Sequence, residues 1–209
     1  MDTLAAIFRN AGAPIWINIC VSLVVVATII ERIYVLFYAY RIDADAFVAT
    51  IIKMVKNREV DKAVKVCATT KAPVARICKA GLGQANAGAL EVSTAIDEEL
   101  MRVTPLLEKR IPSLWSLANI ATLIGLLGTI YGLIRSFRAL GAVSPEQKAK
   151  FLSDGISEAM NNTAVGLAIA ILCMIGHLVL SGTSKKMLAD LDVTAVTFEN
   201  FLILRDRQK

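Results

Sequence analysis

The sequence predicts an all-α integral membrane protein with three transmembrane helices and a helical cytoplasmic region. The chain has 209 residues, of which 56% are hydrophobic, and its mean hydropathy is +0.58. Both values are high for a soluble fold of this length. Three apolar runs are each long enough to cross the hydrocarbon core of a bilayer, which takes about 20 helical residues. We expect the second and third helices to extend beyond the bilayer.

The apolar runs and the segments between them divide the chain into seven parts. These are an outer-side amphipathic lead-in at 1–13, transmembrane helix 1 at 14–40, a cytoplasmic helical region at 41–112, transmembrane helix 2 at 113–140, a short periplasmic turn at 141–144, transmembrane helix 3 at 145–182 and a cytoplasmic tail at 183–209. Pro14 suits the start of the first span, and Ser144 and Pro145 suit the N-cap and first position of the third. No small-x-small cleavage site follows the first run, so we interpret it as a retained anchor.

Apolar residues spaced three and four apart predict four helices in the region 41–112, beginning near Val48, Val60, Val74 and Val92. The alternation that marks strands is absent. Pro105 should bend or interrupt the last of these helices.

Three glycines, Gly81, Gly83 and Gly88, are expected to loosen the chain between the third and fourth of these helices.

The charge distribution predicts the orientation in the membrane. The region 41–112 has twelve Lys and Arg residues against nine Asp and Glu, and the tail from Ser181 has five basic residues. Because basic segments favour the cytoplasmic side, we place both segments there and the N-terminus in the periplasm. The net charge of +5 is explained by this topology, so we do not expect nucleic-acid binding.

The residues that usually carry enzymatic chemistry are sparse. The four cysteines, Cys20, Cys67, Cys78 and Cys173, show no metal-binding spacing and no disulfide framework, and His177 is the single histidine. A phosphate-binding loop and a hydrolase triad are also missing. We therefore expect no catalytic residues, no metal and no cofactor, and we interpret the chain as a non-enzyme.

The second span has one face almost without bulk. Its small residues step by four and three along the helix, at Ala118, Thr122, Gly125, Thr129, Gly132 and Ser136. Such a face fills space only when another backbone comes very close.

The third span repeats the pattern. Its row contains Gly155, Ala159, Thr163, Gly166, Ala170, Cys173 and His177. We expect the two small faces to pack together, with helix packing carried by Gly125, Gly128, Gly132, Gly155, Ala159 and Gly166. Dense packing alone is the competing explanation for these glycines.

Three polar residues in the spans are candidates for a proton pathway: Thr129, Glu158 and Thr163. Hydroxyls can line a hydrated path, and a carboxylate near membrane depth usually faces water, a partner or a pathway. Alternatively, Glu158 lies in the interfacial turn and forms an ion pair with Arg135 or Arg138.

A second histidine and clustered acids are missing from the spans, so this subunit cannot build a continuous proton relay alone. If protons cross, a partner helix must supply a titratable side chain. His177, near the inner end of the third span, is interpreted as a satisfied polar residue or, alternatively, as part of a relay.

Two motifs resemble a known family. GLLGTIYGLIRSF at Gly125 to Phe137 is similar to the second-span signature of the MotA/TolQ/ExbB family of proton-channel motor subunits, and ISEAMNNTAVGLAIAI at Ile156 to Ile171 is similar to its third. The order of spans resembles the three-span ExbB/TolQ branch. Many members of that branch have proline where this chain has Thr122-Leu123 and Leu172-Cys173, so a gliding-motility motor of the same family stays open.

The resemblance implies a homopentamer in the bacterial inner membrane around a dimer of a single-span ExbD/TolR-like partner whose aspartate takes the proton. Thr129, Glu158 and Thr163 match polar channel positions of the family. The hypothesis is a stator subunit that couples proton motive force to mechanical work, for transport, envelope maintenance or gliding motility. The alternative is a passive oligomeric membrane scaffold.

Overall fold

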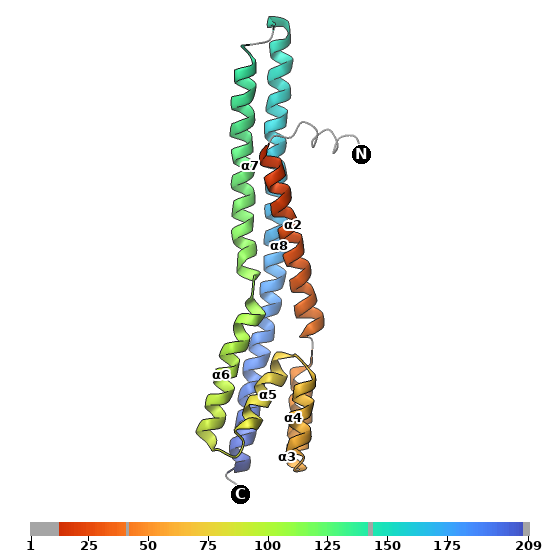
Figure 1. The fold of residues 1–209 in the computed structure, drawn as a ribbon, viewed down its shortest axis with the longest axis vertical. Helices are drawn as coiled ribbons and strands as arrows, with labels where there is room; N and C mark the ends of the chain where they lie inside the picture. The colour runs from red at the N-terminus through yellow and green to blue at the C-terminus, as the bar shows by residue number, and fades with distance from the viewer. Residues whose placement is uncertain (1–12, 41, 142–143, 207–209) are drawn as a thin grey trace. The chain divides into compact units, whose positions relative to one another are not determined.

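The computed structural model describes residues 13–40, 42–141 and 144–206, and all of its regular elements are helical (Figure 1). They are α2 (Ala13–Tyr34), the π-helix η1 (Val35–Ala39), α3 (Ala44–Lys56), α4 (Val60–Thr69), α5 (Pro73–Gly83), α6 (Ala89–Glu108), α7 (Ile111–Ala139) and α8 (Pro145–Asp206). This confirms the predicted all-α class. The predicted lead-in, apart from the backbone of Ala13, and the last three residues of the tail lie outside the described residues.

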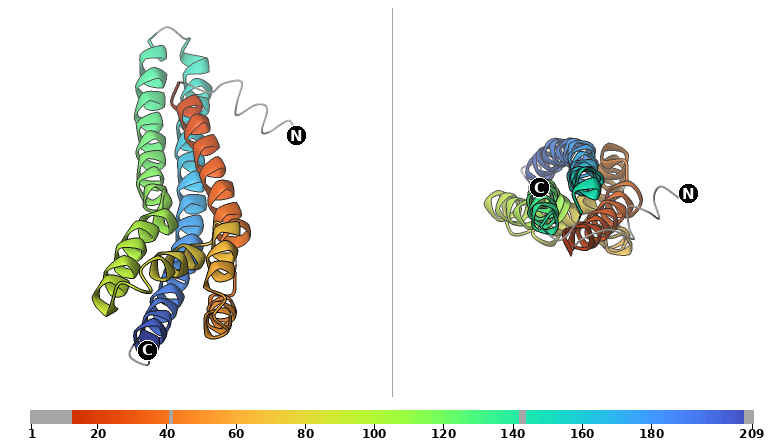
Figure 2. Two further views of the ribbon diagram at one scale, coloured as in Figure 1. Left: turned by 60° about the horizontal axis from the view of Figure 1, so that its bottom comes forward. Right: turned by 90° about the horizontal axis from the view of Figure 1, so that it is seen from above.

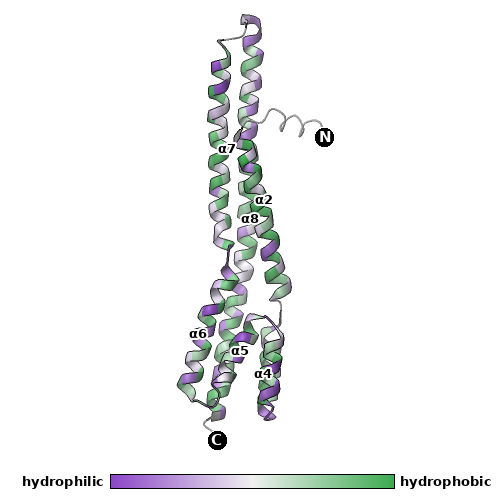
Figure 3. Cartoon of the chain, viewed as in Figure 1, coloured by the Kyte–Doolittle hydropathy of each residue, from purple (hydrophilic) through white to green (hydrophobic). Residues whose placement is uncertain are grey.

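Three helical stretches are long and apolar enough to cross a membrane by length and composition: Pro14–Lys56, Ala89–Ala139 and Pro145–Arg205. Figure 3 shows the hydrophobic colour running along α2, while hydrophilic residues recur along α6. The chain divides into two compact units, one formed by Met1–Ile30 with Arg110–Val179 and the other by Glu31–Lys109 with Leu180–Lys209.

In the first unit, α2, α7 and the membrane part of α8 lie side by side (Figure 2). The three helices meet at Gly176 of α8. A Cβ atom built there would lie 2.8 Å from Ile29 Cδ1 on α2 and 3.9 Å from Leu114 Cδ1 on α7. The missing side chain therefore lets the third span approach Ile29 of α2, whereas the distance to α7 is an ordinary van der Waals contact.

The burial pattern of α7 is the reverse of that in a soluble protein. Its buried residues beyond the first turn are small: Ala118, Ala121, Gly125, Gly128, Gly132 and Ser136. Several of its large apolar residues are at least half exposed, namely Leu123, Leu126, Leu127, Ile130 and Tyr131. A continuous apolar surface of this kind must be covered by lipid or by another chain.

The second unit is a helical region with an ordinary apolar core. Four helices and the C-terminal part of α8 contribute its buried side chains, which include Val48, Ile51, Val55, Ala63, Cys67, Val74, Ile77, Cys78, Val92, Ile96, Phe198 and Leu202. The Asp43 side chain caps α3 by accepting a hydrogen bond from Ala46 N at 3.1 Å. Arg76 of α5 and Glu99 of α6 form an ion pair at 2.6 Å.

Some local expectations were wrong. Pro105 does not interrupt its helix, because α6 continues to Glu108, while the bend that was the other predicted outcome stays a prediction. The proline is exposed and only three residues of α6 follow it, so the helix ends shortly after the backbone hydrogen bond that proline removes. Gly81 and Gly83 do not loosen the chain, since both lie inside α5. Gly88 does mark a break: its φ of 135°, which favours glycine, precedes α6.

Gly81 instead permits close packing inside the second unit. A Cβ atom there would lie 3.0 Å from Ile96 Cδ1 and 3.2 Å from Leu202 Cδ1. Helix α8 also continues well beyond the predicted third span at 145–182, since it extends through most of the predicted tail to Asp206. The first span changes to π-helical geometry at Val35, which apolar periodicity does not reveal.

Candidate functional site

The small faces of α7 and α8 are in direct backbone contact. A Cβ atom added to Gly166 would lie 2.6 Å from Ala121 O and 2.9 Å from Gly125 Cα, and one added to Gly128 would lie 2.8 Å from Asn162 Cβ. No side chain fits at these separations. The two helices are therefore held as close as their backbones allow.

The contact continues toward the turn that joins the helices. A Cβ atom on Gly132 would lie 3.0 Å from Ala159 Cβ, and one on Gly155 would overlap Ser136 Oγ at 1.8 Å. The Ser136 hydroxyl donates to Gly132 O at 2.8 Å. The structure thus brings together all six residues that were predicted to carry helix packing.

Two hydroxyls meet in the middle of this packed seam. Thr129 Oγ1 on α7 and Thr163 Oγ1 on α8 are hydrogen-bonded to each other. Each hydroxyl also lies 3.2 Å from the carbonyl oxygen of Gly125. Both side chains are half-buried. The result is a small polar cluster of two hydroxyls and one carbonyl at the centre of an apolar interface.

Asn162 adds an amide to the seam, although the sequence analysis gave it no role. The residue is 2% exposed, and its Nδ2 donates to Gly128 O at 3.4 Å. Its Oδ1 has no protein partner. A buried acceptor without a partner is unfavourable by about 1–3 kcal/mol unless water or another chain satisfies it. An asparagine inside an apolar run was the signal that could have drawn attention to it.

Asn18 was missed for the same reason. It lies in the apolar part of α2, is 1% exposed, and its Oδ1 also lacks a hydrogen-bond partner. Buried amides in a membrane span are usually satisfied by neighbouring helices or by water.

Glu158 reaches one of its two predicted ion-pair partners. Its Oε1 lies 3.6 Å from Arg135 Nη1, and the side chains of Glu158 and Arg135 are 27% and 63% exposed. Arg138 is exposed and forms no ion pair with another described residue. This geometry supports an ion pair at the end of the span, one turn before Asn162 and on the same helix as Thr163.

His177 is satisfied by the protein itself. Its Nδ1 lies 3.1 Å from Ile111 O, where it must donate because the carbonyl oxygen can only accept. Its ring lies 6.1 Å from that of Trp115. Between Glu158 and His177, α8 contains no other acidic or basic side chain. Within the described residues, no group of three or more His, Cys, Asp and Glu side chains could hold a metal ion.

These features define a helical membrane protein whose second and third spans enclose hydroxyl and amide groups in a tightly packed seam. The comparisons with known proteins name the class. Residues 69–193 match the MotA/TolQ/ExbB proton channel family. The chain belongs to this family, which confirms the resemblance inferred from the two span motifs.

Two curated relatives cover most of the chain. A biopolymer transport protein named ExbB-like 3 from Synechocystis sp. is 30% identical over 155 residues, which are 74% of this chain and 73% of that protein. An ExbB homolog from Methanothermobacter thermautotrophicus is 24% identical over 82% of this chain and 61% of that protein. Tol-Pal system protein TolQ from Haemophilus influenzae matches at 35% identity over 34% of this chain and 31% of that protein.

The fold has a counterpart among solved structures. A structure of MotAB from C. jejuni superposes with a TM-score of 0.64 at 13% identity, covering 88% of this chain and 73% of the matched chain. At this identity the likeness establishes the fold. The family and the fold together make this chain a stator-type proton channel protein of the membrane.

Proposed function

We propose that this chain is the channel-forming subunit of an inner-membrane motor, and that protons pass along the seam between α7 and α8 at Thr129 and Thr163. The observation that carries the proposal is the hydrogen-bonded threonine pair, which lies in the seam where Gly125 and Gly166 bring the backbones of the two helices into contact. Hydroxyls both donate and accept hydrogen bonds, so they can hold a water or pass a proton without becoming charged themselves.

Glu158 is assigned to the outer end of the pathway. Its pairing with Arg135 keeps a carboxylate at this end of α8, and the exposure of the arginine leaves room for the pair to open. We infer that Glu158 collects or releases protons there, whereas Asn162, one turn further along α8, offers an unpaired acceptor to a water.

A second protein is required for the middle of the pathway. The sequence of α7 has no acidic or basic residue between Ile111 and Ile134, and α8 has none between Glu158 and His177. We propose that a single-span ExbD/TolR-like partner places its carboxylate beside Thr129 and Thr163. Each proton that crosses releases about 2.3 kcal/mol per 100 mV of membrane potential, which successive protons can supply to mechanical work.

The uncovered surface of the spans supports an oligomer. Only 17% of the most apolar window of the first span is buried within the chain, and 28% of each of the other two. We propose a homopentamer around a dimer of the partner, with the remaining surface in lipid. The N-terminus is assigned to the periplasm, and the region 41–112 and the C-terminus to the cytoplasm, from the distribution of basic residues.

The proposal is tested by removing hydroxyls without changing shape. T129V and T163V replace each threonine with an isosteric apolar side chain, while T129S and T163S keep the hydroxyl. T122V is the matched control, since the Thr122 hydroxyl bonds to Ala118 O of its own helix at 3.0 Å. Each variant is co-purified with a co-expressed single-span ExbD/TolR-like protein and reconstituted in liposomes, and dye-reported proton influx is measured under an imposed potential.

We expect proton influx to fall at least about tenfold in T129V and T163V, equivalent to 1.4 kcal/mol or more in the barrier. The serine variants and T122V should keep it. The complex should assemble to the same size in all five variants. Full influx in both valine variants, in intact complexes, would leave the passive scaffold as the better explanation of the glycine packing.

A further inference from the structure

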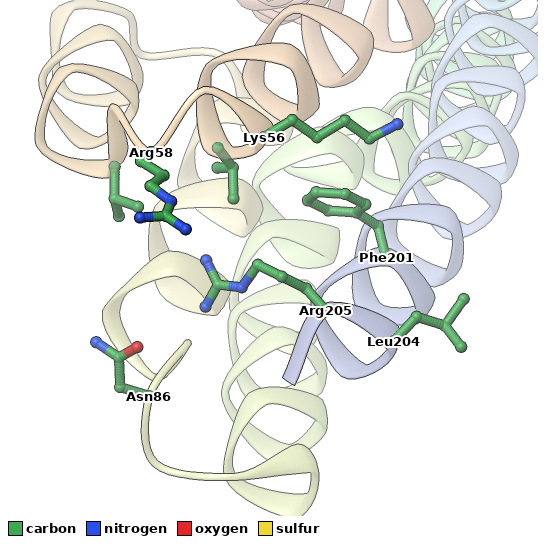
Figure 4. A pocket seen from close by; sticks show the side chains of 8 residues that line it. Lys56, Arg58, Asn86, Phe201, Leu204 and Arg205 are labelled. Carbon is green, nitrogen blue, oxygen red and sulfur yellow. The ribbon is translucent and has the colours of Figure 1, made fainter. Parts of the chain in front are cut away.

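A second candidate site lies within the second unit, which is assigned to the cytoplasm, among residues that take no part in the proposed proton pathway. It is a pocket of about 790 Å³ between the turn that follows α3, the turn that follows α5 and the last turns of α8 (Figure 4). Its polar and aromatic lining, together with one leucine, consists of Lys56, Arg58, Asn86, Phe201, Leu204 and Arg205. The volume is in the range of pockets that hold small organic ligands.

The lining is cationic and its charge is not balanced locally. It includes Lys56, Arg58 and Arg205, and no aspartate or glutamate is among the described residues that line it. None of the ion pairs found among the described residues involves these three side chains. Glu59 follows Arg58 directly, but its carboxylate pairs with Lys62 at 2.6 Å.

The two arginines converge on one end of the pocket. Figure 4 shows their guanidinium groups pointing toward each other from opposite walls. Arg205 Nη2 donates to Ala85 O at 2.8 Å, which fixes the direction of the side chain, while its buried Nε has no hydrogen-bond partner. Two guanidinium groups that face each other repel unless an anion lies between them, and their planar donor arrays match phosphate oxygens.

A purely structural explanation accounts for only part of this arrangement. Lys56 and Arg205 lie in the last turns of α3 and α8, where positive charge offsets the helix dipole. Arg58 lies beyond α3 with a φ of 62°, in the left-handed region where glycine or asparagine is favoured. Arginine therefore has no conformational advantage at this position.

The other end of the pocket is aromatic and apolar. Phe201 presents its ring there, with Lys56 Nζ 5.8 Å from the ring centroid, and Leu204 is 57% exposed beside it. A flat heterocycle could stack on or against these side chains, and the Asn86 amide lies at the rim (Figure 4).

We propose that this pocket binds a nucleotide-like ligand, with phosphate between Arg58 and Arg205 and an aromatic ring against Phe201 and Leu204. This inference is independent of the proposed proton pathway, because none of its residues belongs to α7 or to the membrane part of α8. It assigns a ligand site to the cytoplasmic unit in addition to the channel in the membrane.

ADP is the probe, and binding is measured by calorimetry on the full chain in an uncharged detergent at low salt. We expect saturable binding with a Kd below about 1 mM. Pyrophosphate, which lacks the ring, should compete more weakly, and adenosine, which lacks the phosphates, should bind at least about tenfold more weakly than ADP. Raising the salt concentration should weaken ADP binding because the contacts are ionic.

R58G separates binding from folding. Glycine removes the guanidinium group and also relieves the left-handed backbone, so ADP affinity should fall roughly 10- to 100-fold while the unfolding midpoint stays equal or rises. F201L should weaken ADP and leave pyrophosphate unchanged. K65Q is the matched control, since Lys65 is an exposed cation of the same unit outside the pocket, and it should bind ADP like the parent protein.

Three results would overturn the inference. The first is the absence of saturation by both ADP and pyrophosphate. The second is an ADP affinity that R58G does not change. The third is preferential binding of glycerophosphoglycerol, the headgroup of an anionic lipid, over ADP, which would assign the pocket to a membrane lipid instead of a nucleotide.

Discussion

Adding one methyl group at Gly166 should force α7 and α8 apart. In G166A the new Cβ atom would lie 2.6 Å from Ala121 O, whereas ordinary contacts of this kind begin at 3.4 Å, so the backbones must separate by about 0.8 Å. The opposing atoms are backbone and cannot rotate away. A gap of this size removes a quarter to a half of the dispersion energy of the atoms it separates.

We expect the overpacking in G166A to destabilise the spans by about 1–3 kcal/mol. The higher helix propensity of alanine relative to glycine should offset up to about 1 kcal/mol of this loss. Gly182 is the matched control on the same helix, because a Cβ atom there would meet no atom within 4 Å. G182A should therefore be neutral or stabilising by up to about 1 kcal/mol.

The assay is reversible unfolding in mixed micelles, followed by tryptophan fluorescence and by circular dichroism. Trp16 on α2 and Trp115 on α7 report the unfolding of the spans. If G166A unfolds at the same denaturant fraction as the parent protein and G182A, the two helices are not in backbone contact and the proposed seam is wrong.

Two further predictions concern the second unit. E99Q should lower the stability of this unit by about 1 kcal/mol, because the Glu99 side chain is only 14% exposed and pairs with Arg76. E98Q removes a charge from an exposed ion pair and should change the stability by less than about 0.5 kcal/mol. Equal effects of the two substitutions in denaturant titrations would contradict this prediction. The hydrogen bond between Cys67 and Cys78 lowers the pKa of Cys67, and together with burial it raises the pKa of Cys78 well above its usual range, so that Cys78 keeps its proton. The folded state then holds this proton more tightly than the unfolded chain, so stability should fall as pH rises above about 8.5, by up to about 1.4 kcal/mol per pH unit. C78S, whose hydroxyl does not ionise, should flatten that slope, and an unchanged slope between pH ~8.5 and ~10 would refute the assignment.

Local chemistry in the sequence was sufficient for the class of fold. Apolar length and basic flanks indicated three spans, and a four-and-three spacing of small residues placed Gly125 and Gly166 on faces that could touch. These properties can be recognised in the sequence of each helix separately, without knowledge of its neighbours. Misjudged details such as Pro105 and Gly81 depended on what surrounds each residue, which the local pattern does not contain.

The register between α7 and α8 was decided only by the tertiary structure. Both rows of small residues allow several alignments one turn apart, and the packed structure selects the one in which Thr129 meets Thr163 and Glu158 meets Arg135 rather than Arg138. The pocket at Arg58 has the same origin, because it joins side chains that are almost 150 positions apart in the chain. The composition of a helix can be read from its sequence. Whether two polar groups on different helices are in contact depends on the separation and the register of the packed helices.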